Sequence, residues 1–321
     1  MSVHVLCLTP VPPSQKKCFG DAGYILHDHQ GLERRSSPPA NASEIRAIIT
    51  NGANGVTAAM IESLPNLEIV CAMAVGVENI DFVACDARGL VVTHGPGTNA
   101  TAVADHAIAL MFAVARNIIY GDATARANDW SNARRPYPLV VNKNLGVFGL
   151  GRIGALVAQR VSGLNMTVRY HNRNRRDDVP YEYCDSLQAL AEKSDYLILA
   201  ALGGHETRHV VNEAVLDALG PHGFLINIAR GSLVSNELLA AAVKTGRIGG
   251  AAIDVFEGEP TFPEVLNDVR DKLVVTPHMA GAAAETRAAV EQLMLQNLEN
   301  HFAGRPVVTP APRGTKPLAP G

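Results

Sequence analysis

The sequence predicts an α/β protein made of two doubly wound parallel-sheet domains. Short apolar runs alternate with segments of helical periodicity, which is the pattern of strands joined by crossover helices. A glycine-rich turn joins one apolar run to a helical pattern at 145–161, and residues 1–144 precede it, so an earlier domain must come first. With 321 residues, 47% of them hydrophobic, the chain is long enough for two complete cores.

Composition excludes several classes of protein. The formal net charge of -3 gives no sign of a nucleic-acid surface, so we expect no nucleic-acid partner. Five cysteines without C-x-x-C spacing indicate neither a metal site nor a secreted disulfide framework, and we expect reduced, mostly buried thiols. The amino terminus does not match a signal peptide and no apolar run reaches membrane-spanning length, so we expect a cytoplasmic protein without a membrane partner.

The apolar runs give the expected order of elements. A long apolar helix is expected at 102–117, as a buried bridge between the domains, and an amphipathic helix at 282–302 that stops at Gly304. The stretch 306–321 is rich in Pro and Gly and is expected to be an extended tail. Strands are expected at 3–8, 45–50, 67–71 and 90–93 before the glycine-rich turn, and at 166–170, 196–200, 223–228, 250–254 and 273–276 after it.

The glycine-rich turn has the form G-x-G-x-x-G and lies between a strand and a helix. Gly149 allows the tight turn, Gly151 lets the backbone approach a pyrophosphate, and Gly154 permits close packing of the helix on the strand. Free amides at the helix start, at Arg152 and Ile153, attract the anion. The motif predicts dinucleotide binding; the alternative is a tight turn in an ordinary α/β domain.

The end of the next strand indicates which dinucleotide is bound. An acidic residue would contact the ribose 2′-hydroxyl of NAD there, but 171–176 is polar and basic and includes Asn172 and Arg173. Guanidinium groups suit a 2′-phosphate, so NADP is favoured and NAD is the alternative cofactor. A solvated basic loop is the other interpretation, because Asp177 and Asp178 partly neutralise the cluster.

Four further segments resemble the signatures of a known family. The segments 227–234, 251–260 and 276–281 look like the three carboxyl-terminal signatures of the D-isomer-specific 2-hydroxyacid dehydrogenases, and 74–81 resembles that family's substrate loop. With the glycine motif they cover the chain from about 70 to 305 in the family order. Within the family, the basic 170–173 and the segment 217–221 are most similar to glyoxylate/hydroxypyruvate and hydroxyphenylpyruvate reductases.

The late position of the glycine motif and the resemblance together imply the domain organisation. We expect a Rossmann coenzyme domain, 99–285, inserted in a discontinuous, flavodoxin-like substrate domain, 1–98 with 286–321, and a cleft between them. The resemblance also implies a homodimer. Trp130, the only tryptophan, is expected either to reach the partner's active site, as an aromatic residue does in similar reductases, or to shield the surface.

The chemistry of 2-keto acid reduction calls for a cation and a proton donor. Arg230 ends an apolar strand, where its guanidinium could hold the substrate carboxylate and polarise the ketone; a structural ion pair is the alternative. His278 ends the strand 273–276 and suits proton transfer near neutral pH. Because the chain has eleven histidines, position and not residue type selects His278.

A carboxylate behind the imidazole would raise its pKa and hold its tautomer. Glu257 and Glu259 both fit by spacing, and the resemblance selects Glu259 because the family's acid directly precedes the proline, here Pro260. The resemblance also assigns the backbone amides of Val75 and Gly76 to the substrate carboxylate, with a simple turn as the alternative. On the cofactor side it places Ile228, Ala229, Asp254 and His278, where Asp254 would bind the nicotinamide carboxamide or serve only as a turn cap. Ser235 stands where many relatives carry an acid, which affects a helix cap.

These observations predict an NADPH-preferring reductase of small 2-keto acids, with glyoxylate and hydroxypyruvate first and hydroxyphenylpyruvate next. Arg230, Glu259 and His278 would form the catalytic set. An NAD-linked D-2-hydroxyacid dehydrogenase that works toward oxidation is the competing enzyme. A dinucleotide-sensing scaffold without activity is a third hypothesis, which the complete Arg-Glu-His set disfavours. Side-chain specificity stays open, because pocket loops carry no transferable code.

Overall fold

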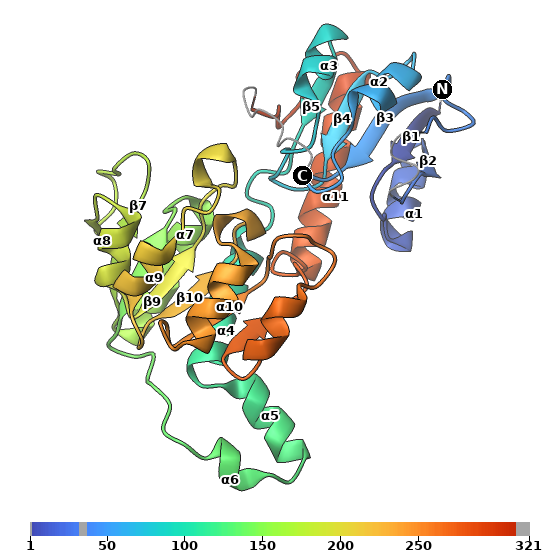
Figure 1. Ribbon diagram of the computed structural model, residues 1–321. Coiled ribbons are helices and arrows are strands. Elements are labelled where there is room, and N and C mark those ends of the chain that lie inside the picture. The colour runs from blue at the N-terminus through green and yellow to red at the C-terminus, as the bar shows by residue number, and fades with distance from the viewer. Residues whose placement is uncertain (1, 32–36, 313–321) are drawn as a thin grey trace. The chain divides into compact units, whose positions relative to one another are not determined.

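The computed structural model describes residues 2–31 and 37–312 of the chain (Figure 1). The chain divides into two compact units, the first formed by Met1–Asn99 with Ala283–Gly321 and the second by Ala100–Ala282. It passes from the first unit to the second directly before helix α4 (Ala100–Ala115), and back directly before helix α11 (Ala284–Phe302).

The first unit contains a five-stranded parallel sheet with the order β2-β1-β3-β4-β5, which is the flavodoxin-like order that the sequence predicts. Helices α1 (Pro13–Asp21) and α11 pack on one face, and α2 (Ala58–Ser63) and α3 (Phe82–Ala87) on the other. Its strands are β1 (Val3–Cys7), β2 (Tyr24–Asp28), β3 (Ile45–Thr50), β4 (Ile69–Ala72) and β5 (Val91–Thr93).

Two features of this unit differ from the sequence prediction. Strand β2 was not predicted, because it is an edge strand of five residues in which only Tyr24 is fully buried, so it lacks a continuous apolar run. The expected tail begins with an ordered part: Ala311 N donates to Val92 O (2.8 Å), and Thr93 pairs with Pro310 in an antiparallel bridge. The remainder of that tail, 313–321, lies outside the described residues.

The second unit contains a seven-stranded parallel sheet with the order β12-β11-β10-β9-β6-β7-β8. Counted from β6, this is the doubly wound Rossmann order with one strand added, and the order reverses between β6 and β9. The Rossmann-type coenzyme fold is thereby confirmed. Its strands are β6 (Asn144–Phe148), β7 (Thr167–His171), β8 (Glu182–Tyr183), β9 (Tyr196–Leu199), β10 (Phe224–Asn227), β11 (Gly250–Ile253) and β12 (Leu273–Val275).

Helices cover both faces of the second sheet. Helices α4 and α7 (Arg152–Arg160) pack on one face, and α8 (Leu187–Glu192), α9 (Glu213–Leu219) and α10 (Asn236–Lys244) on the other. Helix α4 belongs wholly to this unit, where it contacts β10, β11, β12 and α7. Its predicted carboxyl end was too late: α4 ends at Ala115, and Asn117 turns the chain with a φ of 49°.

An arm follows this turn. Helix α5 (Ile118–Arg126) is bent by 60° from α4, and α6 (Trp130–Ala133) follows; Figure 1 shows both extending away from the sheet of their own unit. Among the described residues, no single helix has the length and apolar character needed to cross a membrane. The bent pair α4 and α5 meets both requirements only when the two helices are taken together. The cytoplasmic location stays a prediction.

The cysteine prediction holds in part. All five cysteines are free, and four of them, Cys7, Cys71, Cys85 and Cys184, are buried, whereas Cys18 is partly exposed. Burial raises the pKa of Cys7 and Cys71 to about 12, so these thiols stay protonated and pack as small apolar side chains.

Candidate active site

The glycine-rich loop lies at the point where the strand order of the second sheet reverses. Gly149 has a φ of 98°, and a Cβ there would lie 2.4 Å from the backbone nitrogen of Ala201, which follows β9. A Cβ at Gly154 would lie 2.3 Å from Gly149 O. Both positions therefore require glycine for the fold itself, through the turn geometry and the packing of α7 on β6.

Gly151 differs from these two glycines. A Cβ at Gly151 would meet no protein atom within 4 Å, and its φ of -81° suits any residue. The fold therefore leaves open space at this position, which fits the close approach of a pyrophosphate. Gly151 is also the N-cap of α7, so no side chain caps the helix, and the amides of Arg152 and Ile153 begin its first turn.

The polar cluster after β7 braces the glycine-rich loop. Asn172 Oδ1 accepts a hydrogen bond from Leu150 N (2.6 Å), and Arg176 Nη1 donates to Leu150 O (2.8 Å). Arg176 also bonds Asp178 (2.5 Å), which raises the pKa of the arginine. Asn172 and Arg176 thus hold both polar groups of one loop residue.

Arg173 has the most exposed guanidinium of this cluster. Its side chain is 83% exposed and lies 3.4 Å from Glu206, which is 81% exposed. Arg175 lies 3.6 Å from Asp177, so the neutralisation by aspartates predicted from the sequence falls on Arg175 and Arg176. An exposed pair such as Arg173 with Glu206 has little net energy, so an anionic ligand could replace the carboxylate.

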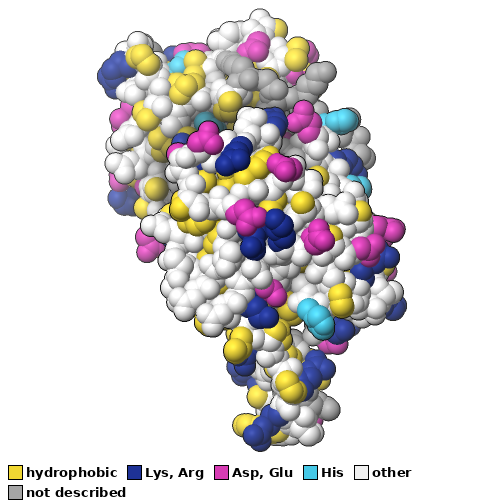
Figure 2. All heavy atoms as spheres, turned by 90° about the vertical axis from the view of Figure 1, so that its left-hand side faces the viewer, with side chains coloured by type: hydrophobic (Ala, Val, Ile, Leu, Met, Phe, Trp, Pro, Cys, Tyr) yellow, Lys and Arg dark blue, Asp and Glu magenta, His cyan; other side chains and the backbone are white. Residues whose placement is uncertain are grey.

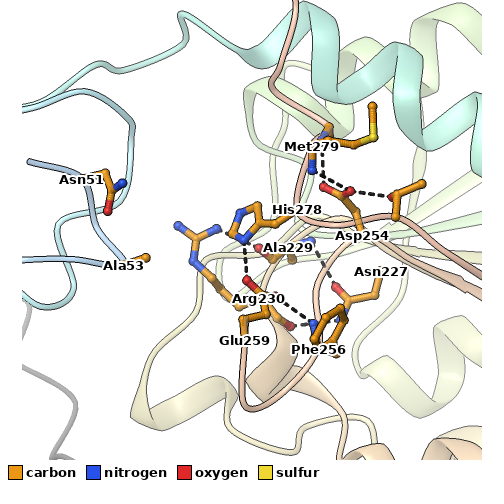
Figure 3. Close-up of polar contacts among 12 residues, drawn as sticks. Asn51, Ala53, Asn227, Ala229, Arg230, Asp254, Phe256, Glu259, His278 and Met279 are labelled. Atoms are coloured by element: carbon orange, nitrogen blue, oxygen red, sulfur yellow. Dashed lines mark hydrogen bonds and ion pairs between the residues drawn. The ribbon is translucent and has the colours of Figure 1, made fainter. Parts of the chain in front are cut away.

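Arg230 follows the carboxyl end of β10, and its backbone is held by the buried Asn227 (Figure 3). Asn227 Oδ1 accepts from Ala229 N (3.0 Å), and Asn227 Nδ2 donates to Arg230 O (3.0 Å). The guanidinium donates to Ala229 O (2.7 Å). A Cβ at Gly203 would lie 2.6 Å from Arg230 Cγ, so the loop after β9 packs directly on the arginine side chain.

His278 and Glu259 form a close pair beside Arg230 (Figure 3). His278 Nδ1 lies 2.6 Å from Glu259 Oε2, and Glu259 Oε1 accepts a hydrogen bond from Phe256 N (2.9 Å). The hydrogen bond that His278 donates to Glu259 holds the pKa of His278 above its ordinary value, against the opposing effects of burial and of the Arg230 charge. Both carboxylate oxygens of Glu259 are thereby used to orient one imidazole.

Asp254, at the end of β11, is buried and holds the segment that carries His278. Its Oδ1 accepts from Thr276 Oγ1 (2.5 Å) and Met279 N (2.9 Å), and its Oδ2 accepts from Ala280 N (2.9 Å). His278 N donates to Asp254 O (2.8 Å). Asp254 therefore caps this turn, which is the turn-cap role given above as the alternative to binding the nicotinamide carboxamide.

His106 was not singled out from the sequence. It lies on α4, and its Nε2 is 2.9 Å from Thr276 Oγ1 and 3.5 Å from Asp254 Oδ1. The available signal was a histidine within a mostly apolar helix. His106 thus extends the hydrogen-bonded network behind His278.

Glu257, the competitor of Glu259, contacts a different histidine. Its Oε1 lies 2.8 Å from His209 Nε2 and 3.3 Å from Arg208 Nη2. The two carboxylates therefore point to different partners, although they stand on the same turn. This separation could not be read from their spacing.

The other predicted site residues belong to other segments of the chain. Val75 and Gly76 belong to the first unit, in the loop after β4. His94 Nδ1 lies 3.3 Å from Val75 O. Gly76 is buried against Gly52: a Cβ at Gly52 would lie 2.7 Å from Gly76 C. Trp130, on α6, is 64% exposed. Ser235 caps α10, because its hydroxyl accepts from Leu238 N (3.1 Å), which confirms the cap expected there.

Comparison with known proteins places this site in a family context. The model of the D-isomer specific 2-hydroxyacid dehydrogenase, NAD binding domain, matches residues 108–280. A glyoxylate/hydroxypyruvate reductase A of Arabidopsis thaliana is 39% identical over 96% of this chain and 99% of its own length. A hydroxyphenylpyruvate reductase of Plectranthus scutellarioides is 40% identical over 84% of this chain and 86% of its own.

A solved structure is similar over the whole length. The NADPH-dependent glyoxylate/hydroxypyruvate reductase of Sinorhizobium meliloti, in complex with NADP and malonate, is 31% identical with a TM-score of 0.88, and the match covers 100% of each chain. With the family model and these relatives in agreement, the chain belongs to the D-isomer-specific 2-hydroxyacid dehydrogenases, which are NAD(P)-dependent oxidoreductases.

Proposed function

We propose that this enzyme is an NADPH-preferring reductase of small 2-keto acids, with glyoxylate and hydroxypyruvate as its first substrates. The observation that carries the proposal is the pair of His278 and Glu259 at 2.6 Å beside Arg230, at the strand ends of a dinucleotide-binding sheet. These groups supply a proton, the carboxylate that tunes it and a fixed cation. Relatives named as reductases of these two keto acids support the choice of substrates.

His278 is the proposed proton donor. Its Nδ1 faces Glu259, so Nε2 is the nitrogen that gives a proton to the forming alkoxide. The raised pKa of His278 keeps this nitrogen protonated to higher pH, which suits reduction. In the oxidative direction the neutral imidazole would accept the proton.

Arg230 is the proposed carboxylate ligand and polarising cation. Asn227 fixes its backbone and Gly203 packs on its side chain, so the guanidinium loses little further freedom when a keto acid binds. Following the family resemblance, the backbone amides of Val75 and Gly76 would share the carboxylate.

The second unit supplies the proposed cofactor site. The amides at Arg152 and Ile153 would hold the pyrophosphate above Gly149, Gly151 and Gly154, and Ile228, Ala229, Asp254 and His278 would line the nicotinamide side. When bound, the reduced nicotinamide supplies a hydride to the carbonyl carbon. For Asp254, capping the turn of 276–280 leaves its Oδ2 able to accept one further hydrogen bond.

We assign the 2′-phosphate of NADPH to Arg173, with Asn172 beside it. Arg173 is exposed, and its 3.4 Å contact with Glu206 is one that a doubly charged phosphate would outcompete. Arg173→Ala is expected to raise KM for NADPH about tenfold or more and to leave KM for NADH unchanged. Arg175→Ala, which removes a similarly exposed arginine, is the matched control.

The decisive experiment follows loss of nicotinamide absorbance with glyoxylate, hydroxypyruvate, pyruvate and hydroxyphenylpyruvate, each with NADPH and with NADH. Turnover with NADPH and the smaller keto acids is the expected result. Turnover with NADH alone would reject the Arg173 assignment and favour an NAD-linked dehydrogenase. Cofactor binding without any turnover would favour the scaffold hypothesis.

We also propose a homodimer formed through the arm. Figure 2 shows hydrophobic and basic side chains together on the projecting arm, and exposed hydrophobic residues along it and its return segment are Ile118, Ile119, Trp130 and Leu139. Arg135 stacks on Tyr120 and bonds Tyr137, which ties the return segment to α5. An ordered arm with unpartnered apolar side chains suits burial against a second copy.

A further inference from the structure

We propose that Glu257 and His209 form a second histidine–carboxylate pair, whose task is to position Arg230. The inference rests on the proposed role of Arg230 as the carboxylate ligand. Glu257 Oε1 lies 2.8 Å from His209 Nε2, and Arg208 Nη2 lies 3.3 Å from the same oxygen. The pair joins two segments, the loop 201–211 after β9, which packs on the Arg230 side chain, and the turn 256–259 after β11, which packs on the backbone of Gly231.

The loop 201–211 contacts the Arg230 segment in three places. Gly203 packs on the arginine side chain, where a Cβ would lie 2.6 Å from Arg230 Cγ. His209 N donates to Ser232 O (2.8 Å), and Val211 N donates to Leu233 O (3.0 Å). The loop therefore follows the residues directly after Arg230 and sets one wall of its side-chain space.

The turn 256–259 contacts the same segment from another side. A Cβ at Gly231 would lie 2.1 Å from Phe256 C and 2.6 Å from Glu257 N, so the backbone after Arg230 lies directly against this turn. The buried side chain of Asn236 holds the backbone of Glu257, accepting from its N–H (3.3 Å) and donating to its carbonyl oxygen (3.0 Å).

His209 has a backbone conformation that needs outside support. Its φ of 49° is left-handed, a conformation that residues with a side chain rarely adopt. The contact of its ring with Glu257 and the bond of its N–H to Ser232 hold it there. Without the pair, the loop keeps only the contact of Arg208 with the turn, so we expect Gly203 to be held less firmly against Arg230.

The pair stands close to Glu259 as well, so the two routes must be separated. Glu257 and Glu259 share one turn, and Glu259 controls His278. If the pair acts through Arg230, its loss weakens carboxylate binding and leaves the pH dependence of His278 unmoved. If it acts through Glu259, the pH profile moves instead.

The test uses His209→Asn, which keeps a residue suited to a left-handed φ but shortens the reach to Glu257, and Glu257→Gln, which removes the charge. We expect each to raise KM for glyoxylate and the dissociation constant of the analogue oxalate, measured on the enzyme–dinucleotide complex, about tenfold. Dinucleotide affinity and the midpoint of the pH profile stay unchanged. Glu213→Gln, which breaks the exposed 3.6 Å pair with Arg247 in the same unit, is the control.

A double-mutant cycle with Arg230→Lys decides whether the pair acts through the arginine. In that background, His209→Asn is expected to change oxalate binding less than twofold. Additive losses, or a shifted pH profile, would overturn the proposal. If Arg230→Lys itself left oxalate and glyoxylate binding intact, the proposed role of Arg230 would fall. Loss with Arg230→Lys but wild-type binding in both pair variants would reject the positioning pair alone.

Discussion

Two residues, His278 and Glu259, determine the expected pH dependence of the reaction. The hydrogen bond and charge of Glu259 raise the pKa of His278, so its protonated form persists to higher pH. Reduction uses the protonated form, so kcat/KM for a keto acid falls as pH rises through this raised pKa. Glu259→Gln should move the fall to lower pH, and each lost pKa unit lowers the protonated fraction about tenfold above the pKa.

The measurement is the pH profile of kcat/KM for both enzymes, with the dinucleotide saturating. The oxidative direction gives the mirror image, because the neutral imidazole is required and activity rises with pH. Glu257→Gln removes a carboxylate from the same turn without touching His278, so the midpoint of its profile should coincide with that of the wild type even though kcat/KM itself is lower at every pH. An unmoved profile in Glu259→Gln would contradict the assignment of Glu259 as the tuning carboxylate.

At the level of elements, the junction of β6 and α7 allows fold and cofactor binding to be tested separately. Gly154→Ala places a Cβ 2.3 Å from Gly149 O and 2.9 Å from Val147 Cγ1, so α7 must shift from β6. Overpacking of this kind costs about 1–3 kcal/mol, and the unfolding midpoint should fall together with dinucleotide affinity. Thermal unfolding and fluorescence titration with NADPH measure the two effects.

Gly151→Ala is the matched substitution in the same loop. Its Cβ meets no protein atom within 4 Å and its φ suits alanine, so the unfolding midpoint should stay at the wild-type value or rise slightly. Dinucleotide affinity should still fall about tenfold, because the methyl group occupies the space through which the pyrophosphate approaches. Wild-type affinity in this variant would be inconsistent with the proposed pyrophosphate position.

For the whole molecule, the arm formed by α5 and α6 determines the expected assembly. Ile119 on α5 is 59% exposed, and Ile119→Asp should convert the proposed dimer to a monomer at micromolar concentration, because a carboxylate cannot be buried unpaired. Sedimentation velocity measures the change. Val83→Asp, at an equally apolar but 76% exposed position on α3, should leave the assembly intact. A monomeric wild type would reject the homodimer.

Most of the fold could be predicted from local pattern. Apolar runs of four to six residues in parallel sheets are buried on both faces, so β3, β4 and β9 to β11 stand out in the sequence. The unpredicted strands β2 and β8 are edge strands, in which pairing on one side supplies what the side chains do not. The end of α4 was predicted too late because the helical periodicity of α4 continues into α5. The left-handed Asn117 separates the two helices.

The sequence by itself determined the fold class, the glycine motif and the identity of the residues at the strand ends, because each depends on neighbours within a few positions along the chain. The family resemblance selected Glu259 for His278, but only the tertiary structure decided that Glu257 meets a different histidine, His209. Glu259 with His278 and Glu257 with His209 are contacts across 19 and 48 residues, and both glutamates satisfy the same spacing. Such pairs form only when the ends of separate strands converge at one edge of a sheet, so their geometry is a property of the packed molecule.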